Sequence, residues 1–259
     1  TPPTRRTPTA RPVPPASAHR TIDPDLVFEP PHVPDDITAG AVFPIDKSAG
    51  RTSFDVVRDV RRLTDHKKVG HAGTLDPLAT GLLIVLVARP ATRLQDAFMF
   101  LRKTYTATLR LGESTPSHDA ETDVVETHDP SHLSDDRIRE TVLSFVGDSE
   151  QVPPMYSAVK IEGEKLYKKA RRGEDVDRPP RPITIYDAAV TGIRGAEVDV
   201  RIECSKGTYI RSLARDLGAA LGVGAHLTAL RRTAIGPYSV EKAWTLDGLR
   251  DALSEASGH

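Results

Sequence analysis

The sequence predicts an α+β fold with a mixed, largely antiparallel sheet flanked by helices. Two segments, residues 103–112 and 197–204, alternate apolar and polar side chains in the manner of half-buried strands. A third segment, residues 82–87, is wholly apolar and has the length of a buried strand. The helical patterns between these segments follow no regular strand–helix–strand rhythm, so an all-parallel sheet is not expected.

Composition favours a soluble globular protein. The 259 residues suffice for one large domain or two small ones, and 38% of them are hydrophobic and 27% charged. No apolar run approaches the roughly 20 residues that a membrane-spanning helix needs. The single cysteine, Cys204, excludes an internal disulfide and a cysteine-based zinc site, and it suits a reducing compartment. We therefore expect a cytoplasmic protein.

Residues 1–39 are predicted to form a disordered, proline-rich arm. Ten of the 21 prolines fall in this stretch, and no apolar periodicity is present. The first 20 residues carry four arginines and no acidic residue, as a transit peptide would, but they show neither an amphipathic helix nor an apolar core segment. The interpretation is a flexible basic tail able to touch RNA weakly, followed by one folded domain over residues 40–259.

The folded part begins with a short strand at residues 41–47 and a turn at residues 47–50. Thr52 or Ser53 can cap the helix that follows, with Asp55 in its first turn, and this helix ends by Asp65. The remaining expected elements, in chain order, are a strand at 82–88, a helix at 91–101, a strand at 103–112, an acidic loop at 113–129, a helix from Ser131 or Ser134, a loop at 151–161 that enters a strand, a basic helix at 166–172, a linker at 179–182, strands at 183–190 and 197–204, a helix around 210–217, a basic and apolar segment at 225–232, a strand at 236–240 and a helix around 246–253.

Charge is segregated along the chain although the formal net charge is only −1. Residues 58–71 contain five basic and two acidic side chains, and residues 155–182 contain eight basic and five acidic ones, so each stretch has a net charge of +3. Residues 113–150 contain eleven acidic and two basic side chains, a net charge of −9. Separate basic stretches can present a phosphate-binding face without a high isoelectric point, and they can also be solvated helix faces.

The rest of the chain is organised around residues 70–81, which read GHAGTLDPLATG. Gly70, Gly73 and Gly81 allow backbone conformations that other residues avoid, and Pro77 pushes Asp76 toward an extended conformation. The run therefore holds one carboxylate on a constrained loop that leads into a buried strand. On pattern alone, Asp76 can be either a catalytic group or an ordinary turn residue.

Several short motifs in a fixed order resemble the TruB family of pseudouridine synthases, the enzymes that convert uridine 55 of tRNA to pseudouridine. The resemblance covers about residues 42–249. Its motifs are Lys47-x-x-Gly50-x-Thr52-Ser53, the run 70–81, Lys103-Thr104-Tyr105 with Leu111-Gly112, Gln151-x-Pro153-x-x-Ser157-Ala158-x-Lys160, Tyr167-x-x-Ala170-Arg171-x-Gly173, Arg181-Pro182, Cys204-Ser205-Lys206-Gly207-Thr208-Tyr209-Ile210-Arg211 and Leu230-Arg231-Arg232-Thr233. The resemblance implies a pseudouridine-synthase-like core.

The resemblance implies that Asp76 is the catalytic aspartate. The reaction breaks the C1′–N1 bond, turns the base and joins C5 to C1′, and Asp76 would either attack C1′ or remove a ribose proton. Arg211 would lie beside Asp76 and favour its ionised form. Tyr209 would transfer a proton at C5 of the rotated base. From the residues alone, Arg211 can also be a surface helix arginine and Tyr209 a core aromatic.

Further positions would form the uridine site by the same resemblance. Tyr105 would stack on the flipped uracil and Leu230 would form an apolar wall of the pocket, although both are also ordinary core residues by pattern. His71 would enter the tRNA loop near the target base rather than bind a metal. Lys47 resembles a supporting loop residue near the site, and Asp119 matches an acidic position of secondary rank.

The basic stretches would then meet phosphates of the tRNA T arm, with little reading of sequence. The residues expected there are Lys67, Lys68, Lys165, Lys168, Lys169, Arg171, Arg172, Arg231 and Arg232. Specificity would come from the shape of the T stem-loop and from the flipped base. The resemblance implies no cofactor, metal or ATP, because the reaction is redox-neutral, and it implies no protein partner. We expect a monomer.

Two departures from the family pattern stand out. Ser48 replaces the proline that usually follows the motif lysine, which loosens a turn but removes no chemical group. Bacterial relatives usually continue into a small C-terminal RNA-binding PUA domain, whereas this sequence ends at His259. RNA affinity is therefore expected to depend more on the basic segments and the arm.

Three rival functions remain open at the level of sequence. The first is a non-catalytic RNA-binding or tRNA-folding protein on the same scaffold, against which the intact set of Asp76, Tyr105, Tyr209 and Arg211 argues. The second is a glycosidase or nucleosidase, which needs a second carboxylate beside Asp76, and the motifs offer no convincing one. The third is a pseudouridine synthase that acts on another RNA.

Overall fold

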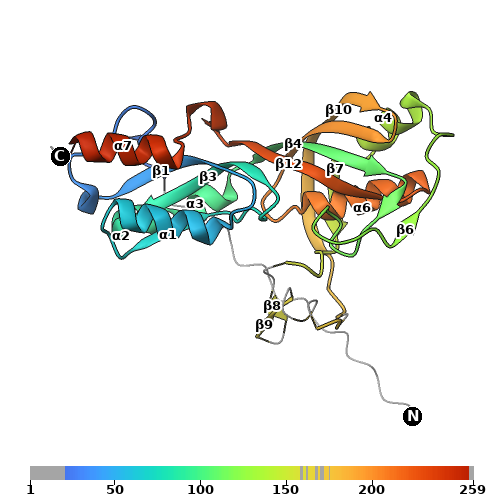
Figure 1. Cartoon of the computed structure of the whole chain (residues 1–259), viewed down its shortest axis with the longest axis horizontal. Helices are drawn as coiled ribbons and strands as arrows, with labels where there is room; N and C mark the ends of the chain where they lie inside the picture. The colour runs from blue at the N-terminus through green and yellow to red at the C-terminus, as the bar shows by residue number, and fades with distance from the viewer. Residues whose placement is uncertain are drawn as a thin grey trace, which may run out of the picture.

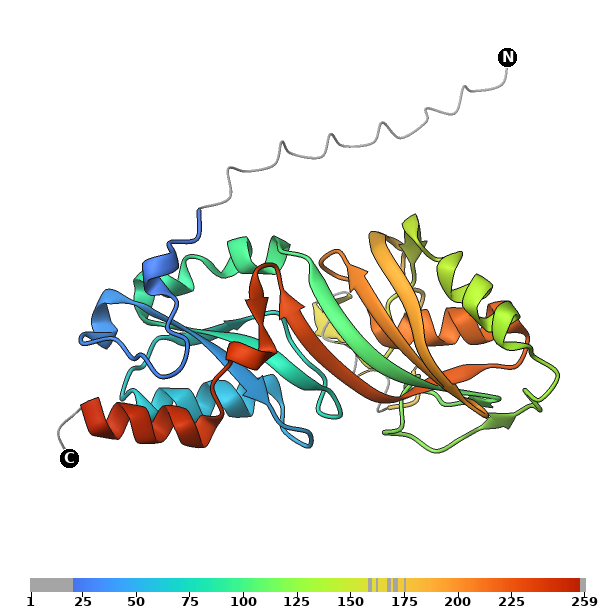
Figure 2. The ribbon, with the colours of Figure 1, turned by 90° about the horizontal axis from the view of Figure 1, so that it is seen from above.

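The computed structural model describes residues 21–157, 160–161, 163–166, 169, 172–174 and 176–256. The described chain forms an elongated molecule whose two halves share one continuous sheet (Figures 1 and 2). The sheet has the strand order β1-β3-β12-β4-β11-β10-β7, with β13 paired to β12 and β2 paired to β3. All of its pairs are antiparallel except β12 with β3. This topology confirms the predicted mixed, largely antiparallel sheet.

The strands of this sheet are β1 (Ala41–Lys47), β2 (Val69–Ala72), β3 (Thr80–Val87), β4 (Lys103–Leu111), β7 (Gly147–Gln151), β10 (Arg181–Arg194), β11 (Glu197–Cys204), β12 (Ala225–Ile235) and β13 (Tyr238–Ser239). The helices are α1 (Ser53–Leu63), α2 (Ala88–Thr92), α3 (Gln95–Phe100), α4 (Asp135–Leu143), α6 (Ile210–Leu221) and α7 (Leu246–Ala256). Two small hairpins pair β5 (Glu113–Ser114) with β6 (Glu126–Thr127) and β8 (Lys160–Ile161) with β9 (Glu164–Lys165). In the described part of the chain, no helix is long and apolar enough to cross a membrane.

The half of the sheet built from β1 and β3 is covered on both faces. One apolar cluster joins alternate residues of these strands to α1 and α7, and another joins the intervening residues to α2 and α3. Every residue from Leu82 to Val87 is therefore buried. This arrangement explains why the strand reads as a continuous apolar run rather than as an alternating one.

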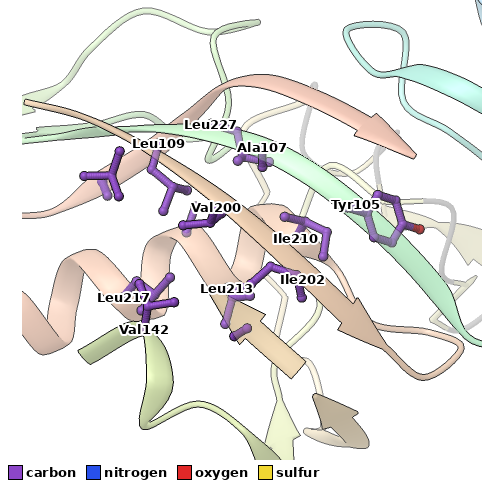
Figure 3. Close-up of a cluster of buried hydrophobic side chains, with 14 of the residues drawn as sticks. Tyr105, Ala107, Leu109, Val142, Val200, Ile202, Ile210, Leu213, Leu217 and Leu227 are labelled. Atoms are coloured by element: carbon purple, nitrogen blue, oxygen red, sulfur yellow. The ribbon is translucent and has the colours of Figure 1, made fainter. Parts of the chain in front are cut away.

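The other half of the sheet is covered on one face only, by α4 and α6. Figure 3 shows the cluster on this face, where Leu109 and Val200 from the strands lie near Leu213 and Leu217 of α6. The opposite face carries the polar residues of β4, of which Thr106 is exposed and the others are half-buried. One-sided cover accounts for the alternation that predicted β4 and β11.

Residues 21–39 pack against the folded domain, so the prediction of a disordered arm is wrong for this stretch. Two 3₁₀ turns, η1 (Pro24–Leu26) and η2 (Ile37–Ala39), flank a segment in which the Phe28 ring lies 6.2 Å from the Phe43 ring. The indole nitrogen of Trp244 donates to the Phe28 carbonyl at 2.8 Å. The domain thus includes residues before position 40, and residues 1–20 lie outside the described part.

Of the other local predictions, the start of α1 is confirmed and several others differ from the structure. Thr52 caps α1 with Asp55 in a reciprocal capping box, as expected for that helix start. The helix predicted over 91–101 is split into α2 and α3, and the segment 225–232 is the start of the central strand β12. Strands β2 and β7 were not predicted. The predicted helix 166–172 lies largely outside the described residues.

Candidate active site

The loop that carries Asp76 joins β2 to β3 and is fastened on both sides of that residue. The Ser53 hydroxyl, at the start of α1, accepts a hydrogen bond from the Leu75 amide at 2.8 Å and donates one to the Leu75 carbonyl at 3.0 Å. The Pro77 carbonyl accepts a hydrogen bond from the Gly50 amide at 2.9 Å. The backbone before and after Asp76 is therefore fixed, so the carboxylate is presented from a rigid turn.

Asp76 is paired with Arg211, which α6 supplies from the other half of the molecule. Arg211 Nη2 donates to Asp76 Oδ1 at 3.0 Å, and Nε lies 2.9 Å from Oδ2. The same guanidinium donates to the carbonyls of Ser117 and Tyr156 at 3.2 and 2.7 Å. The Arg211 side chain is 5% exposed and that of Asp76 is 36% exposed. The carboxylate of Asp76 is thus partly accessible to solvent, whereas its counterion Arg211 is buried and held by further hydrogen bonds.

Asp119 is a second carboxylate on the same guanidinium. Its Oδ2 lies 3.5 Å from Arg211 Nε, and its side chain is 1% exposed. Asp119 also accepts hydrogen bonds from the Ser117 hydroxyl and the Glu121 amide. Because it is buried and fully engaged, Asp119 is not placed to act as the paired acid of a glycosidase. Among the described residues, no group of three or more His, Cys, Asp or Glu side chains could hold a metal ion.

The acidity of Asp76 reflects opposing effects. Burial is the largest cause and raises the pKa of Asp76 above its ordinary value, and the negative charge of Asp119 adds to this. The neighbouring Arg211 and, more weakly, Lys47 lower the pKa. The net direction is upward, so Arg211 favours the ionised form of Asp76 but offsets the effect of burial only in part.

Lys47 lies at the end of β1 beneath the loop, with its side chain buried. Its ammonium donates to the carbonyls of Ser48, Arg51 and Pro77 at 3.0, 2.7 and 3.4 Å. Burial lowers the pKa of Lys47 to about 8, while the charge of Asp76 opposes this shift. Lys47 therefore ties the Pro77 carbonyl of the loop to the turn that follows β1.

Tyr105 and Leu230 come from the adjacent strands β4 and β12. Leu230 pairs with Ala107 and Arg232 pairs with Tyr105 in the antiparallel register, so the two predicted pocket residues lie near one another on the sheet. Figure 3 shows Tyr105 at the edge of the apolar cluster with its hydroxyl oxygen pointing away from the other labelled side chains. Burial raises the pKa of the Tyr105 hydroxyl, which therefore stays protonated.

Tyr209 directly precedes α6 and stands two positions before Arg211. The side-chain amide of Gln151 fixes its backbone, accepting from the Tyr209 amide at 2.8 Å and donating to the Tyr209 carbonyl at 3.1 Å. Burial raises the pKa of the Tyr209 hydroxyl, while Arg181 and the nearby Ser157 hydroxyl lower it. Gln151 is a site residue to which sequence reasoning gave no role, although it stood in one of the family motifs.

His71 lies on β2, just before the loop. Burial and the nearby charge of Arg232 lower the pKa of His71, so its ring is neutral near pH 7. Its Nδ1 is buried and has no hydrogen-bond partner among the described residues. The Gln95 side chain donates to the His71 carbonyl at 3.0 Å and holds the backbone there.

The predicted phosphate contacts differ in their surroundings. Lys67 and Lys68 are exposed on the loop between α1 and β2. Lys169 is half-buried beside the β8–β9 hairpin, and Lys168 and Arg171 lie outside the described residues. No single basic surface that includes all of them is therefore defined by the described chain.

Two further predicted contacts are already paired with carboxylates. Arg231 donates to both oxygens of Asp46, at 3.0 and 2.7 Å, and its Nη1 lies 3.4 Å from the Thr80 hydroxyl. Arg172 pairs with Glu164 at 2.8 Å in the same way. Any phosphate that binds these guanidinium groups must compete with those carboxylates.

The prediction that Arg232 contacts phosphates is wrong. It was expected to meet phosphates together with Arg231, but its side chain is only 1% exposed. Adjacent residues of a strand point to opposite faces of the sheet, so the two arginines of this pair have different surroundings. Arg232 Nε donates to the Leu82 carbonyl at 2.7 Å and Nη2 to the Gly73 carbonyl at 3.0 Å, both at the ends of the Asp76 loop.

The fold and the site together define a pseudouridine synthase. A solved chain in a structure titled as an H/ACA ribonucleoprotein bound to a substrate RNA containing 2′-deoxyuridine superposes with a TM-score of 0.65 and 30% identity, covering 92% of this chain and 62% of that one. An archaeal box H/ACA Nop10–Cbf5 complex gives a TM-score of 0.64 at 30% identity, over 92% of this chain and 63% of that one. This chain thus spans about three fifths of those solved chains.

The particular family follows from the sequence comparisons. Residues 61–210 match the TruB family pseudouridylate synthase N-terminal domain, and residues 211–258 match the tRNA pseudouridylate synthase B C-terminal domain. The chain belongs to the TruB family, which confirms the resemblance drawn from the motifs.

Three curated relatives share a name. Proteins called tRNA pseudouridine synthase B from Thermobifida fusca and an Arthrobacter species are each 51% identical, over 82% and 81% of this chain and 74% and 70% of their own lengths. The protein of that name from Mycobacteroides abscessus is 48% identical over 83% of this chain and 74% of its own length.

Proposed function

We propose that this protein isomerises uridine 55 in the T-arm loop of tRNA to pseudouridine, acting as a cytoplasmic monomer without a cofactor. The observation that carries the proposal is the Asp76–Arg211 pair, in which a partly exposed carboxylate is held by a buried guanidinium. Membership of the TruB family and relatives named tRNA pseudouridine synthase B support the choice of substrate. The T arm as binding element and the monomeric state are part of the proposal.

The chemistry assigns a role to each site residue. The target uridine leaves its stack and its base lies on Tyr105, with Leu230 as an apolar wall. His71, neutral and lacking an internal partner at Nδ1, occupies the space that the extruded nucleotide leaves. Lys47 holds the loop that carries the carboxylate.

Asp76, as an ionised carboxylate, either bonds to C1′ or removes a ribose proton, and the C1′–N1 bond breaks. The base turns so that C5 meets C1′, and the new C5–C1′ bond forms. On the first route the Asp76–C1′ bond breaks as this bond forms, and on the second route Asp76 returns the proton to the ribose. The proton on C5 then leaves toward the Tyr209 side of the site, and N1 gains a proton. Atoms and charge balance without an external reactant, as an isomerisation requires.

Phosphate contacts supply affinity rather than chemistry. The proposed set is Lys67, Lys68, Lys168, Lys169, Arg171 and Arg231. Charge neutralisation by such residues makes binding salt-dependent and independent of sequence, so the shape of the T stem-loop and the flipped base would provide the selection.

The experiment that tests the proposal uses an unmodified tRNA transcript and the isolated T-arm stem-loop. Pseudouridine is mapped after incubation with the protein, and free uracil is measured in parallel. The proposal expects pseudouridine at position 55 in both RNAs and no free uracil. Product at another position would assign a different RNA target, release of uracil would assign a nucleosidase, and tRNA binding without product would assign a non-catalytic tRNA-binding protein.

A further inference from the structure

Arg232 is a buried cation that lies where three parts of the site meet: the Asp76 loop, the pairing of β3 with β12, and Tyr105 on β4. Its Nε and Nη2 donate to the carbonyls of Leu82 and Gly73, which stand on either side of the Asp76 loop. Both bonds come from one rigid guanidinium, so they fix the separation of the two ends of the loop. Among the described residues, no carboxylate forms an ion pair with it, which makes its burial expensive unless these carbonyls satisfy it.

The backbone of Arg232 is equally constrained. Arg231 pairs with Thr80 and Arg232 with Gly81 where β12 meets β3 in parallel. Gly81 has a φ of +101°, and a Cβ there would lie 2.2 Å from the Arg232 carbonyl oxygen. Only glycine permits this approach. The backbones of β3 and β12 thus approach closely at Arg232, and the side chain of the same residue holds the Asp76 loop.

Arg232 also faces Tyr105. The two residues are cross-strand partners on β12 and β4. The positive charge of Arg232 lowers the pKa of the Tyr105 hydroxyl, against the larger upward effect of burial. Arg232 therefore holds the loop that presents Asp76 by its side chain, and it is the cross-strand neighbour of the tyrosine proposed to stack on the uracil.

We propose that Arg232 is a positioning residue that sets the distance between the Asp76 loop and the Tyr105 ring. This inference rests on the proposed function. In that function the ribose of the target nucleotide lies at Asp76 and its uracil lies on Tyr105, so the distance between them must fit one nucleotide. Arg232 itself makes no contact with RNA phosphate, because its side chain is buried behind the loop. A misplacement of about 1 Å between reacting groups can lower a rate about 100-fold, so a loosened junction should affect the chemical step.

The test compares Arg232→Met, which keeps an unbranched chain but removes every donor, with Arg232→Lys, which keeps the charge. A single ammonium cannot reproduce the planar guanidinium that donates to two separate carbonyls. Arg139→Met is the control for loss of an arginine, since Arg139 is an exposed residue of α4 that donates to the Val190 carbonyl of β10. Single-turnover rates, tRNA dissociation constants and amide hydrogen exchange of residues 73–81 are measured for all three.

The expected single-turnover rate falls about 100-fold in Arg232→Met and at least about tenfold in Arg232→Lys, with tRNA dissociation constants within about threefold of wild type. Amides of residues 73–81 should exchange faster in both variants without RNA. Arg139→Met should match wild type. If Arg232→Met does not fold, Arg232→Lys carries the test.

Three results would overturn the inference. The first is a wild-type rate in Arg232→Lys, which would mean that charge alone suffices. The second is a loss confined to tRNA affinity, which would make Arg232 a phosphate contact. The third is unchanged exchange in residues 73–81. Because the exchange measurement needs no RNA, it decides the positioning role even if wild type forms no pseudouridine and the proposed function fails.

Discussion

Arg211 reaches Asp76 from 135 positions further along the chain, with Nη2 3.0 Å from Oδ1 and Nε 2.9 Å from Oδ2. The pair joins the two halves of the molecule, because Asp76 belongs to the β2–β3 loop and Arg211 to α6. Asp119 contacts the same guanidinium from behind, and its negative charge raises the pKa of Asp76. The geometry makes Arg211 the main group that keeps Asp76 ionised against burial.

Replacing Arg211 by Met should move the acid limb of the pH–rate profile to higher pH. Arg211 lowers the pKa of Asp76, so its removal leaves burial and Asp119, both of which raise that pKa. The rate at pH 6 should fall more than the rate at pH 8. Single-turnover rates between pH 5 and 9 measure this, with Arg139→Met as the control for loss of an arginine. An acid limb that stays in place would show that Arg211 does not control the ionisation of Asp76.

Lys47 should impose an alkaline limb near pH 8. Its pKa is lowered to about 8, so above that pH the charge near Asp76 is lost and the hydrogen bond to the Pro77 carbonyl weakens. The rate should decline through pH 8, and this step should vanish in Lys47→Met, whose rate is already low at pH 7. Stability should change with pH in the opposite direction to the rate. The folded-state pKa of about 8 lies below the unfolded value of 10.5, so the free energy of unfolding rises with pH between these two values. The same step in Lys47→Met would assign it to another group.

Arg231 and Asp46 should have opposite effects on tRNA affinity. Asp46 holds both guanidinium nitrogens of Arg231 in the free protein, so it competes with a phosphate. Arg231→Met should weaken binding and reduce the slope of log K against log salt by about 1, as loss of one phosphate contact does. Asp46→Asn should instead strengthen binding. Equal salt slopes in wild type and Arg231→Met would leave Arg231 as a structural ion pair only.

Gly81→Ala should destabilise the fold more than Gly50→Ala. Both glycines have positive φ, so each substitution carries roughly 1–3 kcal/mol of backbone strain. Only at Gly81 does the new Cβ also collide with backbone, 2.2 Å from the Arg232 carbonyl oxygen, whereas nothing lies within 4 Å at Gly50. Thermal unfolding of the two variants measures the difference. Equal losses would mean that the β3–β12 seam can shift without cost.

The strands that could be predicted are those with regular patterns. The alternation in β4 and β11 and the apolar run of β3 reflect which faces are covered. The strand β12 could not be recognised, because irregularities between Leu227 and Ala229 and between Arg232 and Ala234 break its period of two. Residues 21–39 carry too few apolar side chains to show a period, yet Phe28 packs on Phe43.

The site was predictable only through the family motifs. No local pattern links Asp76 to Arg211, and by itself each has an ordinary structural reading. The motifs brought both together and also contained Gln151 and Ser53, whose roles depend on contacts that only the fold defines. Burial separates Arg231 from Arg232 although the two are neighbours of the same type, so the sequence could not distinguish a candidate phosphate contact from an internal brace.

The most direct measurement compares wild type with Asp76→Asn on an unmodified tRNA transcript, with pseudouridine mapped at single-nucleotide resolution. Burial raises the pKa of Asp76 above 3.8, so stability falls as the pH rises from 3.8 through the folded-state pKa, and near neutral pH the ionised carboxylate adds no stability. Arg211 keeps its contacts with Asp119, Ser117 and Tyr156. The variant should therefore fold as wild type does and still bind tRNA. We predict pseudouridine at position 55 with wild type and none with Asp76→Asn. Product formed by Asp76→Asn at a rate near that of wild type would contradict the assignment of Asp76 as the catalytic carboxylate.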